Sequence, residues 1–502
     1  MSDLPHRLRD ALQQADFSYD SVAELLGPIA HSALSRNETL PGRRRTHGGS
    51  PLETLIRLFL LQTTVPLDHA EAALPGLVDR LAVEGILEQS VGEVAARLDV
   101  RPYATDDTSL WVVSDLTPGL DGGPQRIGTE HVLGISPAST SLAQLTIRDQ
   151  VGTSLDLGTG CGVQALHLAT HSNRVVATDV NQRALWITAF NAALNDVADR
   201  VDVRNGSFFE PVAGERFDLI ATNPPFVISP ATGERLVYRD SGLPGDRVVE
   251  DIVKAAPGML TEGGWCQILG NWIISEDQPW DDRLEGWLSD EVDAFVVQRE
   301  VLDPASYVEL WLKDSGHHGA QDYLTRYDTW LSWFEEQKIE GVGFGWINLH
   351  RRSGARGNVQ STGASNPKRE LLEWPYDVEQ PIAPALKAWG EAARVEVTED
   401  STLVLVEDIQ QETLGQPGAE DPSTVILRQQ RGLRRARQAD TIEAAFAGAC
   451  DGDLAVGQIL DALAQILDRD PAVVRSSYLP IAQELVNEGF LRPAPGTPGP
   501  AA

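Results

Sequence analysis

An alternation of short apolar runs and helical segments constrains the fold of this chain more than any other feature of its sequence. The strand-like runs lie at residues 154–157, 174–179, 201–204, 217–222, 265–269, 294–298 and 343–349. Segments with helical spacing separate most of them. Parallel strands need crossover helices between them, so this order predicts an α/β fold. We expect a Rossmann-like, doubly wound and mostly parallel sheet of seven strands.

A glycine-rich turn, DLGTGCG at residues 156–162, follows the first run and opens a helix. Glycines let the backbone turn sharply and approach a ligand closely. Asp179 ends the next strand, 19 residues after Gly160. A carboxylate at that position can accept both hydroxyls of a ribose. The alternative role for Asp179 is an N-cap of the following helix, but its occurrence together with the turn favours ribose binding.

Four motifs, in order at successive strand ends, resemble the class I S-adenosylmethionine-dependent methyltransferases. They are DLGTGCG, ATDVN at 177–181, NGSFFEP at 205–211 and TNPPF at 222–226. Within that superfamily they are similar to the small methyltransferases with an Asn-Pro-Pro-aromatic motif. That group includes release-factor glutamine methyltransferases, ribosomal RNA guanine-N2 methyltransferases and adenine-N6 methyltransferases. The resemblance covers about residues 126–270, and it implies S-adenosylmethionine as cofactor and S-adenosylhomocysteine as product.

The resemblance also implies a set of cofactor-binding residues. These are Asp156, Gly158, Thr159, Gly160, Gly162, Asp179, Val180, Ser207, Phe208 and Asn223. Asp156 and the first glycines would surround the methionine moiety, Asp179 the ribose, and Ser207 with Phe208 the adenine. The release-factor branch usually has Asp at the position of Ser207, and it has Arg-Pro-Glu where residues 136–138 read Ser-Pro-Ala. The second departure weakens the assignment to that branch.

The motif Asn223-Pro224-Pro225-Phe226 is the predicted catalytic element. A planar nitrogen is a poor nucleophile because its lone pair is delocalised. The Asn223 side-chain oxygen and the Pro224 carbonyl can accept hydrogen bonds from its N–H groups and so aim the lone pair at a methyl group. Pro225 holds the turn, and Phe226 offers a face for a flat group, worth ~1–3 kcal/mol for a base. Positioning supplies most of the rate, so no strong base is required. The alternative is that the prolines only end a strand.

Composition limits the class of protein. The chain has 502 residues, which predicts several domains. No apolar run approaches the length of a membrane span, and residues 1–14 do not read as a signal peptide. The cysteines are Cys161, Cys266 and Cys450, too few and too far apart for a disulfide framework or a metal knuckle. We therefore expect a cytoplasmic protein with no metal site.

Both ends of the chain have the same sequence pattern. A helical segment ends in Glu-Gly and an apolar pair at residues 84–87 and again at 488–491. This pattern is typical of a winged-helix module where the recognition helix enters the wing, and also of an ordinary helix C-cap. We predict a helical, winged-helix-like module at 1–110, a methyltransferase domain at 111–350, and a loop or linker at 351–375. A C-terminal α+β module at 376–502 would have a winged-helix-like end, with a disordered tail from 493.

The charge distribution leaves the substrate open. Net charge is −32, which disfavours general binding of nucleic acid. Basic residues nevertheless gather at 43–47, 350–356 and 428–437, as solvated faces or as local contacts to a polyanion. We place first an exocyclic amine of an RNA base, from ribosomal or transfer RNA. The alternative is a glutamine amide of a translation release factor or another protein. A non-catalytic cofactor-binding scaffold is disfavoured because the motif at 223–226 is intact.

Overall fold

The computed structural model describes residues 3–105, 109–123, 128, 130–230, 243–317, 319–353, 366–417 and 423–495. Two compact units divide the chain. One contains residues 1–143, 148–364 and 370–374, and the other 144–147, 365–369 and 375–502. The middle of the loop or linker predicted at 351–375, residues 354–365, and most of the tail predicted from 493 lie outside the described residues. Within the described ranges, no helix is both long and apolar enough to cross a membrane.

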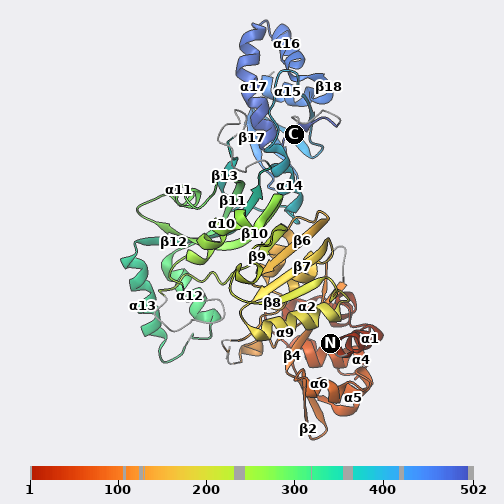
Figure 1. Cartoon of the computed structure of the whole chain (residues 1–502). Helices are drawn as coiled ribbons and strands as arrows, with labels where there is room; N and C mark the ends of the chain where they lie inside the picture. The colour runs from red at the N-terminus through yellow and green to blue at the C-terminus, as the bar shows by residue number, and fades with distance from the viewer. Residues whose placement is uncertain are drawn as a thin grey trace. The chain divides into compact units, whose positions relative to one another are not determined.

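The first unit is built on the predicted doubly wound sheet (Figure 1). Its strands are β6 (Val151–Leu157), β7 (Ser172–Asp179), β8 (Val201–Asn205), β9 (Phe217–Thr222), β10 (Leu260–Ser275), β11 (Val292–Leu302), β12 (Ile339–Arg351) and β13 (Arg369–Glu373). Their spatial order is β13-β11-β12-β10-β9-β6-β7-β8. The five neighbouring strands β10, β9, β6, β7 and β8 are parallel to one another, whereas β12 runs antiparallel to β10 and β11. The prediction of a mostly parallel Rossmann-like sheet is therefore confirmed.

The sheet has one strand more than the seven predicted. The eighth is β13, which lies inside the segment 351–375 that was predicted as a loop or linker. Its sequence RELLE carries only two apolar residues, and all of its residues are partly or fully exposed. Such an edge strand lacks the apolar run that identifies a buried strand, because only one side of it pairs with the sheet.

Six helices pack against the sheet: α8 (Val163–Leu168), α9 (Gln182–Leu194), α10 (Arg247–Met259), α11 (Trp280–Glu285), α12 (Pro304–Asp314) and α13 (Tyr323–Glu336). The other helical elements of this part of the chain are α7 (Pro137–Leu145) and the single 3₁₀ turns η2 (Leu120–Gly122) and η3 (Glu210–Val212). Val248, Val249 and Ile252 of α10, for example, are buried against Leu155 and Ile220 of the central strands. Burial of this kind holds the carboxyl ends of the parallel strands in a fixed arrangement.

The amino-terminal part of the same unit is helical with small sheets. Its elements are α1 (Leu4–Gln14), α2 (Tyr19–Leu34), α3 (Leu40–Arg43), α4 (Pro51–Leu55), a π-helical turn η1 (Ile56–Leu60), β1 (Val65–Pro66), α5 (Leu67–Ala73), α6 (Val78–Val83), β2 (Leu87–Ser90), β3 (Glu93–Ala96), β4 (Leu98–Ala104) and β5 (Ser109–Asp115). From α4 to β3 the order is helix, short strand, two helices and a hairpin, and the sheet order is β1-β3-β2. That order is typical of winged-helix modules.

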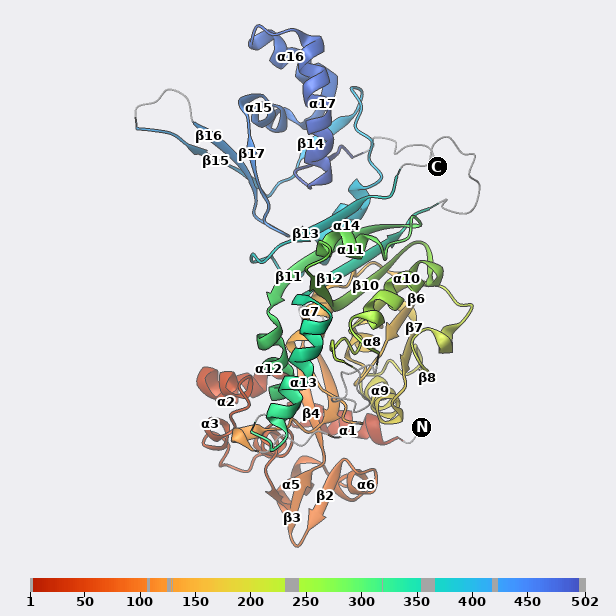
Figure 2. The same ribbon diagram turned by 90° about the vertical axis from the view of Figure 1, so that its left-hand side faces the viewer.

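The second unit contains α14 (Ala383–Ala392), β14 (Thr402–Leu405), β15 (Ile409–Leu414), β16 (Thr424–Gln429), β17 (Ala436–Ala439), α15 (Thr441–Ala449), β18 (Asp451–Ala455), α16 (Val456–Ile466), α17 (Pro471–Asn487) and β19 (Leu491–Pro493). The strands β15, β16 and β17 form a separate antiparallel sheet, visible in Figure 2. From α15 to β19 the order is helix, short strand, two helices and a single strand. Here the central strand of the sheet β18-β14-β19 comes from upstream in the chain.

The two Glu-Gly segments have the same backbone structure. In the first, Gly85 has φ +74° and Ile86 donates its N–H to the carbonyl of Leu81. In the second, Gly489 has φ +83° and Phe490 donates to Leu485. Both are Schellman caps, in which glycine takes the left-handed conformation that other residues avoid. Each cap then leads into a strand, which confirms the C-cap interpretation, and the winged-helix interpretation stays a prediction.

Candidate active site

A cavity of about 380 Å³ lies at the carboxyl ends of β6, β7 and β9. Its lining comes from the glycine-rich turn, the ends of these strands, the segment 131–139 and helix α10. It brings together nearly all of the predicted site residues: Asp156, Gly158, Thr159, Gly160, Asp179, Val180, Ser207, Phe208, Asn223, Pro224, Pro225 and Phe226. Gly162 is the exception.

The glycines of the turn have two different roles. Gly158 has φ +78° and Gly160 φ +55°, and a Cβ atom on either would meet no atom of the protein within 4 Å. Their backbone is therefore open toward the cavity. Gly162 has φ +81°, but a Cβ there would lie 2.9 Å from the Cγ2 atom of Thr188 in α9. Gly162 thus permits close packing of α8 and α9 and does not line the cavity.

Asp156 braces the turn from below. Its Oδ2 atom accepts hydrogen bonds from the Thr159 hydroxyl at 2.6 Å and from the Ala165 N–H at 2.9 Å. The side chain is buried, and burial raises the pKa of this carboxyl to about 7. A group so desolvated and so engaged with the turn acts chiefly on the shape of the loop.

Asp179 presents its carboxylate at the end of β7. One oxygen accepts the N–H of Gly160 at 3.0 Å and the other accepts the N–H of Asn181 at 2.9 Å. Burial raises its pKa above the ordinary value. The N-cap of α9 is Asn181, whose side chain accepts from Arg183 N–H. Asp179 is therefore not the cap of that helix, and each of its oxygens retains capacity for a further hydrogen bond.

Asn223 follows directly on the last residue of β9. The strand end is fixed because the Thr222 hydroxyl donates to the carbonyl of Leu157 at 2.7 Å. The Asn223 Oδ1 atom is buried and has no hydrogen-bond partner in the part of the chain that the structure describes. A buried acceptor without a partner is costly in a folded protein. Its presence in the lining of the cavity marks a place where a donor is missing.

Phe208 and Phe226 supply apolar walls. Phe208 has φ +47°, which is unusual for a bulky residue and is typical of functional sites. Phe226 packs edge-on against Trp311 of α12, with ring centroids 6.2 Å apart. It packs against two apolar clusters. One is formed by the sheet strands and α10, and the other lies around α12 and α13.

Many further lining residues were not predicted as site residues from the sequence, among them His131, Gln164 and Ile252. Gln164 is buried and donates to the carbonyl of Ser139 at 2.6 Å, which ties the segment 131–139 to helix α8. Its place in the sequence just after the glycine-rich turn could have identified it as a lining residue. Ile252 had none, because an isoleucine on an amphipathic helix is read as core.

Other candidate groups have structural roles. Burial raises the pKa of the Cys161 thiol to about 12, which disfavours the reactive thiolate. The ring of His167 lies 3.2 Å from the Tyr103 hydroxyl, and burial lowers its pKa to about 4. Among the described residues, no group of three or more His, Cys, Asp or Glu side chains has the arrangement of a metal site.

The three basic clusters are largely engaged within the protein. In the first, Arg43 pairs with Asp121 at 3.3 Å and Arg45 donates to the carbonyl of Leu25. In the second, Arg351 is buried, donates to the Leu260 carbonyl at 3.0 Å and pairs with Glu291 at 3.2 Å.

The third cluster is engaged in the same way. Arg428 pairs with Glu412, and Arg437 lies among Glu443, Glu484 and Glu488. These arginines neutralise the protein's own carboxylates. They are therefore poor candidates for contacts to phosphate, and this favours the interpretation of the clusters as structural.

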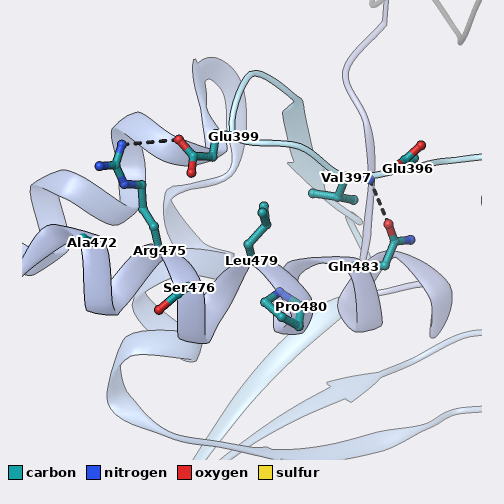
Figure 3. A pocket seen from close by; sticks show the side chains of 9 residues that line it. All are labelled: Glu396, Val397, Glu399, Ala472, Arg475, Ser476, Leu479, Pro480 and Gln483. Atoms are coloured by element: carbon teal, nitrogen blue, oxygen red, sulfur yellow. Dashed lines mark hydrogen bonds and ion pairs between the residues drawn. The ribbon is translucent and has the colours of Figure 1, made fainter.

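A second cavity, of about 510 Å³, lies beside helix α17 in the other unit (Figure 3). Its charged residues are Glu396, Glu399 and Arg475. Arg475 pairs with Glu399 at 3.3 Å, as the dashed line in Figure 3 shows. Gln483 accepts the N–H of Val397 at 2.8 Å. Arg475 and Gln483 are thus bonded to other residues of the cavity wall, in contrast to Asn223 Oδ1.

Comparison with known proteins identifies two regions of the chain. Residues 134–278 match the family described as "Methyltransferase small domain", and residues 14–97 match a "Domain of unknown function (DUF7059)". A release factor glutamine methyltransferase of Xylella fastidiosa is 36% identical over 129 residues, which are 23% of this chain and 46% of that protein. A ribosomal protein uL3 glutamine methyltransferase of Bradyrhizobium diazoefficiens is 34% identical over 138 residues, 25% of this chain and 43% of that protein.

The matched regions cover less than half the length of these relatives. Among solved structures, a SAM-dependent methyltransferase from Thiobacillus denitrificans in complex with S-adenosyl-L-homocysteine aligns with 43% of this chain and 92% of its own. Its sequence identity is 16% and the TM-score is 0.26.

Proposed function

Since residues 134–278 form a methyltransferase small domain, we propose that the protein transfers a methyl group from S-adenosylmethionine to a planar nitrogen. The acceptor that we propose is the side-chain amide of a glutamine in a protein of the translation machinery. The observation that carries this proposal is the buried Asn223 Oδ1 atom. It lacks a hydrogen-bond partner among the described residues and belongs to a residue that lines the same cavity as the glycine-rich turn and Asp179.

The residues of the cavity fit this cofactor. The open backbone at Gly158 and Gly160 leaves room for the methionine moiety, where a Cβ would occupy the cavity. Asp179 can accept from both ribose hydroxyls, and Phe208 provides an apolar wall for the adenine. Ser207 and Val180 complete the lining on that side. When bound, S-adenosylmethionine supplies a methyl group on a positively charged sulfur.

The motif residues would orient the acceptor nitrogen. Asn223 Oδ1 and the Pro224 carbonyl would accept hydrogen bonds from its two N–H groups and hold its lone pair in a single direction. Pro225 restricts the backbone that carries these acceptors. Phe226 would form the flat wall beside the amide. On accepting the methyl group, the amide nitrogen would give up one of its two protons to solvent. Correct alignment of two reactants is worth several orders of magnitude in rate, so these contacts are sufficient without a strong base.

Two observations favour a protein amide over the RNA base that the sequence placed first. The named relatives are glutamine methyltransferases that act on a release factor and on a ribosomal protein. The basic clusters, which were the sequence argument for RNA, are largely paired with the protein's own carboxylates and carbonyls. A translation factor as substrate also agrees with the cytoplasmic location expected from the sequence. RNA remains the second candidate because the motif at 223–226 serves either class of nitrogen.

The test is methyl transfer from labelled S-adenosylmethionine to purified acceptors. The full chain is incubated separately with unmethylated bacterial release factor, with ribosomal protein uL3 and with ribosomal RNA free of protein. We expect label on one of the two proteins, at a glutamine located by mass spectrometry. Label on RNA alone would overturn the proposed acceptor, and label on none of the three would count against all translation-related acceptors.

A further inference from the structure

A helical hairpin is inserted between two neighbouring strands of the sheet. Strands β11 and β12 are antiparallel neighbours, and such strands can be joined by a turn of two residues. Here α12 and α13 lie between them in the chain, and Figure 2 shows these helices beside the sheet. Their apolar faces enclose Val227 and Ile228, the two residues that follow the motif at 223–226.

The hairpin holds the backbone of Ile228 from both sides. The N–H of Ile228 donates to the Tyr307 hydroxyl of α12 at 2.8 Å. The carbonyl of Ile228 accepts from the Trp330 indole N–H of α13 at 3.0 Å. One residue thus has both its backbone groups bound by side chains, each from a different helix of the hairpin.

Burial makes these two contacts matter. Tyr307 and Ile228 are fully buried and Trp330 is 2% exposed. In such an apolar cluster water cannot replace a lost partner, and an unpaired backbone group is unfavourable. The Tyr307 hydroxyl also accepts from the Asn271 side-chain amide at 3.0 Å. We call Tyr307 and Trp330, with their two bonds to Ile228, the clamp. Since Asn271 belongs to β10, the clamp is anchored to the sheet as well as to the hairpin.

The clamp is close enough to the motif to fix its geometry. Ile228 lies five residues after Asn223, and two of the intervening residues are prolines with restricted φ. Trp311 of α12 meets the edge of Phe226. The position of Ile228 and the placement of Phe226 are thus both set by the hairpin, and the chain between them has little freedom to compensate.

We propose that Tyr307 and Trp330 are positioning residues, which hold the Asn223–Phe226 motif in its reactive geometry through the backbone of Ile228. This inference rests on the proposed methyl transfer for its kinetic consequences. Neither side chain lines the cavity, so both act on the reaction only through the motif. Tyr307 and Trp330 would then act on the reaction, although they lie about 80 to 110 residues after the motif in the sequence.

The first test compares matched pairs of variants in the methyl-transfer assay with unmethylated release factor. Tyr307→Phe removes only the hydroxyl, and Trp330→Phe removes the indole N–H. We expect kcat to fall at least about tenfold in each, since small misplacements of reacting groups cost up to about a hundredfold. KM for release factor and the Kd for S-adenosylhomocysteine should change by less than about threefold, by the same reasoning.

The controls are Tyr327→Phe and Trp333→Phe, which make the same chemical changes on α13 away from Ile228. They should keep the kcat of the natural chain. Thermal unfolding identifies the temperatures at which every variant is folded, and rates are compared only there. If the clamp variants are folded and keep their kcat, or if the controls lose as much, the inference is wrong.

The second test does not depend on any substrate. Hydrogen exchange of the Ile228 amide, followed by NMR, reports directly on its bond to Tyr307. We expect exchange in Tyr307→Phe to be about tenfold faster than in Tyr327→Phe. Equal exchange in the two would overturn the clamp. Faster exchange together with no methylation of any acceptor would instead leave the clamp standing and refute the proposed function.

Discussion

Two cavities of the molecule, one at the carboxyl edge of the sheet and one beside α17, differ in how their polar groups are partnered. At the sheet edge, Asn223 Oδ1 is buried without a hydrogen-bond partner in the described part of the chain, and the glycine-rich turn is open. Beside α17, Arg475 and Gln483 bond to residues of their own unit. An unpaired buried acceptor has a free-energy cost that a ligand can remove. Paired groups have no such deficit, so size alone is a poor guide to function.

The largest effect should follow removal of the unpaired acceptor. In Asn223→Ala we expect kcat to fall by about 10²–10³, comparable with the loss of one well-placed hydrogen-bonding group in other active sites. The Kd for S-adenosylhomocysteine should change far less. Both are measured on purified protein, by label transfer and by calorimetry. Full activity in this variant would show that the buried Asn223 Oδ1 atom has no role in the reaction, and the difference between the two cavities would then carry no functional meaning.

The next effect concerns cofactor affinity. Asp179→Ala removes an acceptor that can serve two ribose hydroxyls, and hydrogen bonds to a charged group are worth about 1.5–3 kcal/mol each. We expect the Kd for S-adenosylhomocysteine to rise by about 10²-fold. Asp199→Ala, an exposed carboxylate outside the cavity, serves as the control. An equal change in both variants would mean that only net charge matters.

Stability should depend on pH through Asp156. Burial raises its pKa from the ordinary value of 3.8 to about 7 in the folded protein, so the folded state binds its proton more tightly. The resulting contribution to stability is full below about pH 4 and is lost as pH rises through about 7, with a size on the order of 4 kcal/mol.

Asp156→Asn removes that titration and keeps an acceptor of similar shape. Denaturant unfolding at about pH 5 and about pH 8 should therefore show a flatter dependence in the variant than in the natural chain. An unchanged slope would show that the carboxyl titrates near its ordinary value in the folded protein.

The smallest effect is expected in the second unit. Arg437→Gln leaves Glu443 buried beside two further carboxylates, which should lower the free energy of unfolding by about 2 kcal/mol. Arg434→Gln, at an exposed position nearby, should be nearly neutral. At temperatures where both variants are folded, methyl transfer should match the natural chain. Loss of transfer in a folded Arg437→Gln protein would reveal a role in substrate binding.

Sequence alone determined the sheet and most of the site. The alternating runs predicted β6 to β12, and nearly every residue that the motifs predicted lines the cavity, because local patterns record the strand ends at which ligands bind. Three features escaped it. The strand β13 has no apolar run, Gly162 is distinguished from its neighbours only by contact with Thr188, and Ile252 resembles any core residue.

Only the tertiary structure decided which polar groups are free and which are paired. The arginines at 43, 351 and 437 form a pattern typical of polyanion contacts, but their carboxylate partners are distant in sequence or belong to other elements. Asn223 has no distinguishing feature in the sequence apart from its motif, and its missing partner becomes visible only when its surroundings are packed. The same holds for Ile228, which is bound by side chains from 79 and 102 residues away. Pairing depends on distance in space, and the sequence records only distance along the chain.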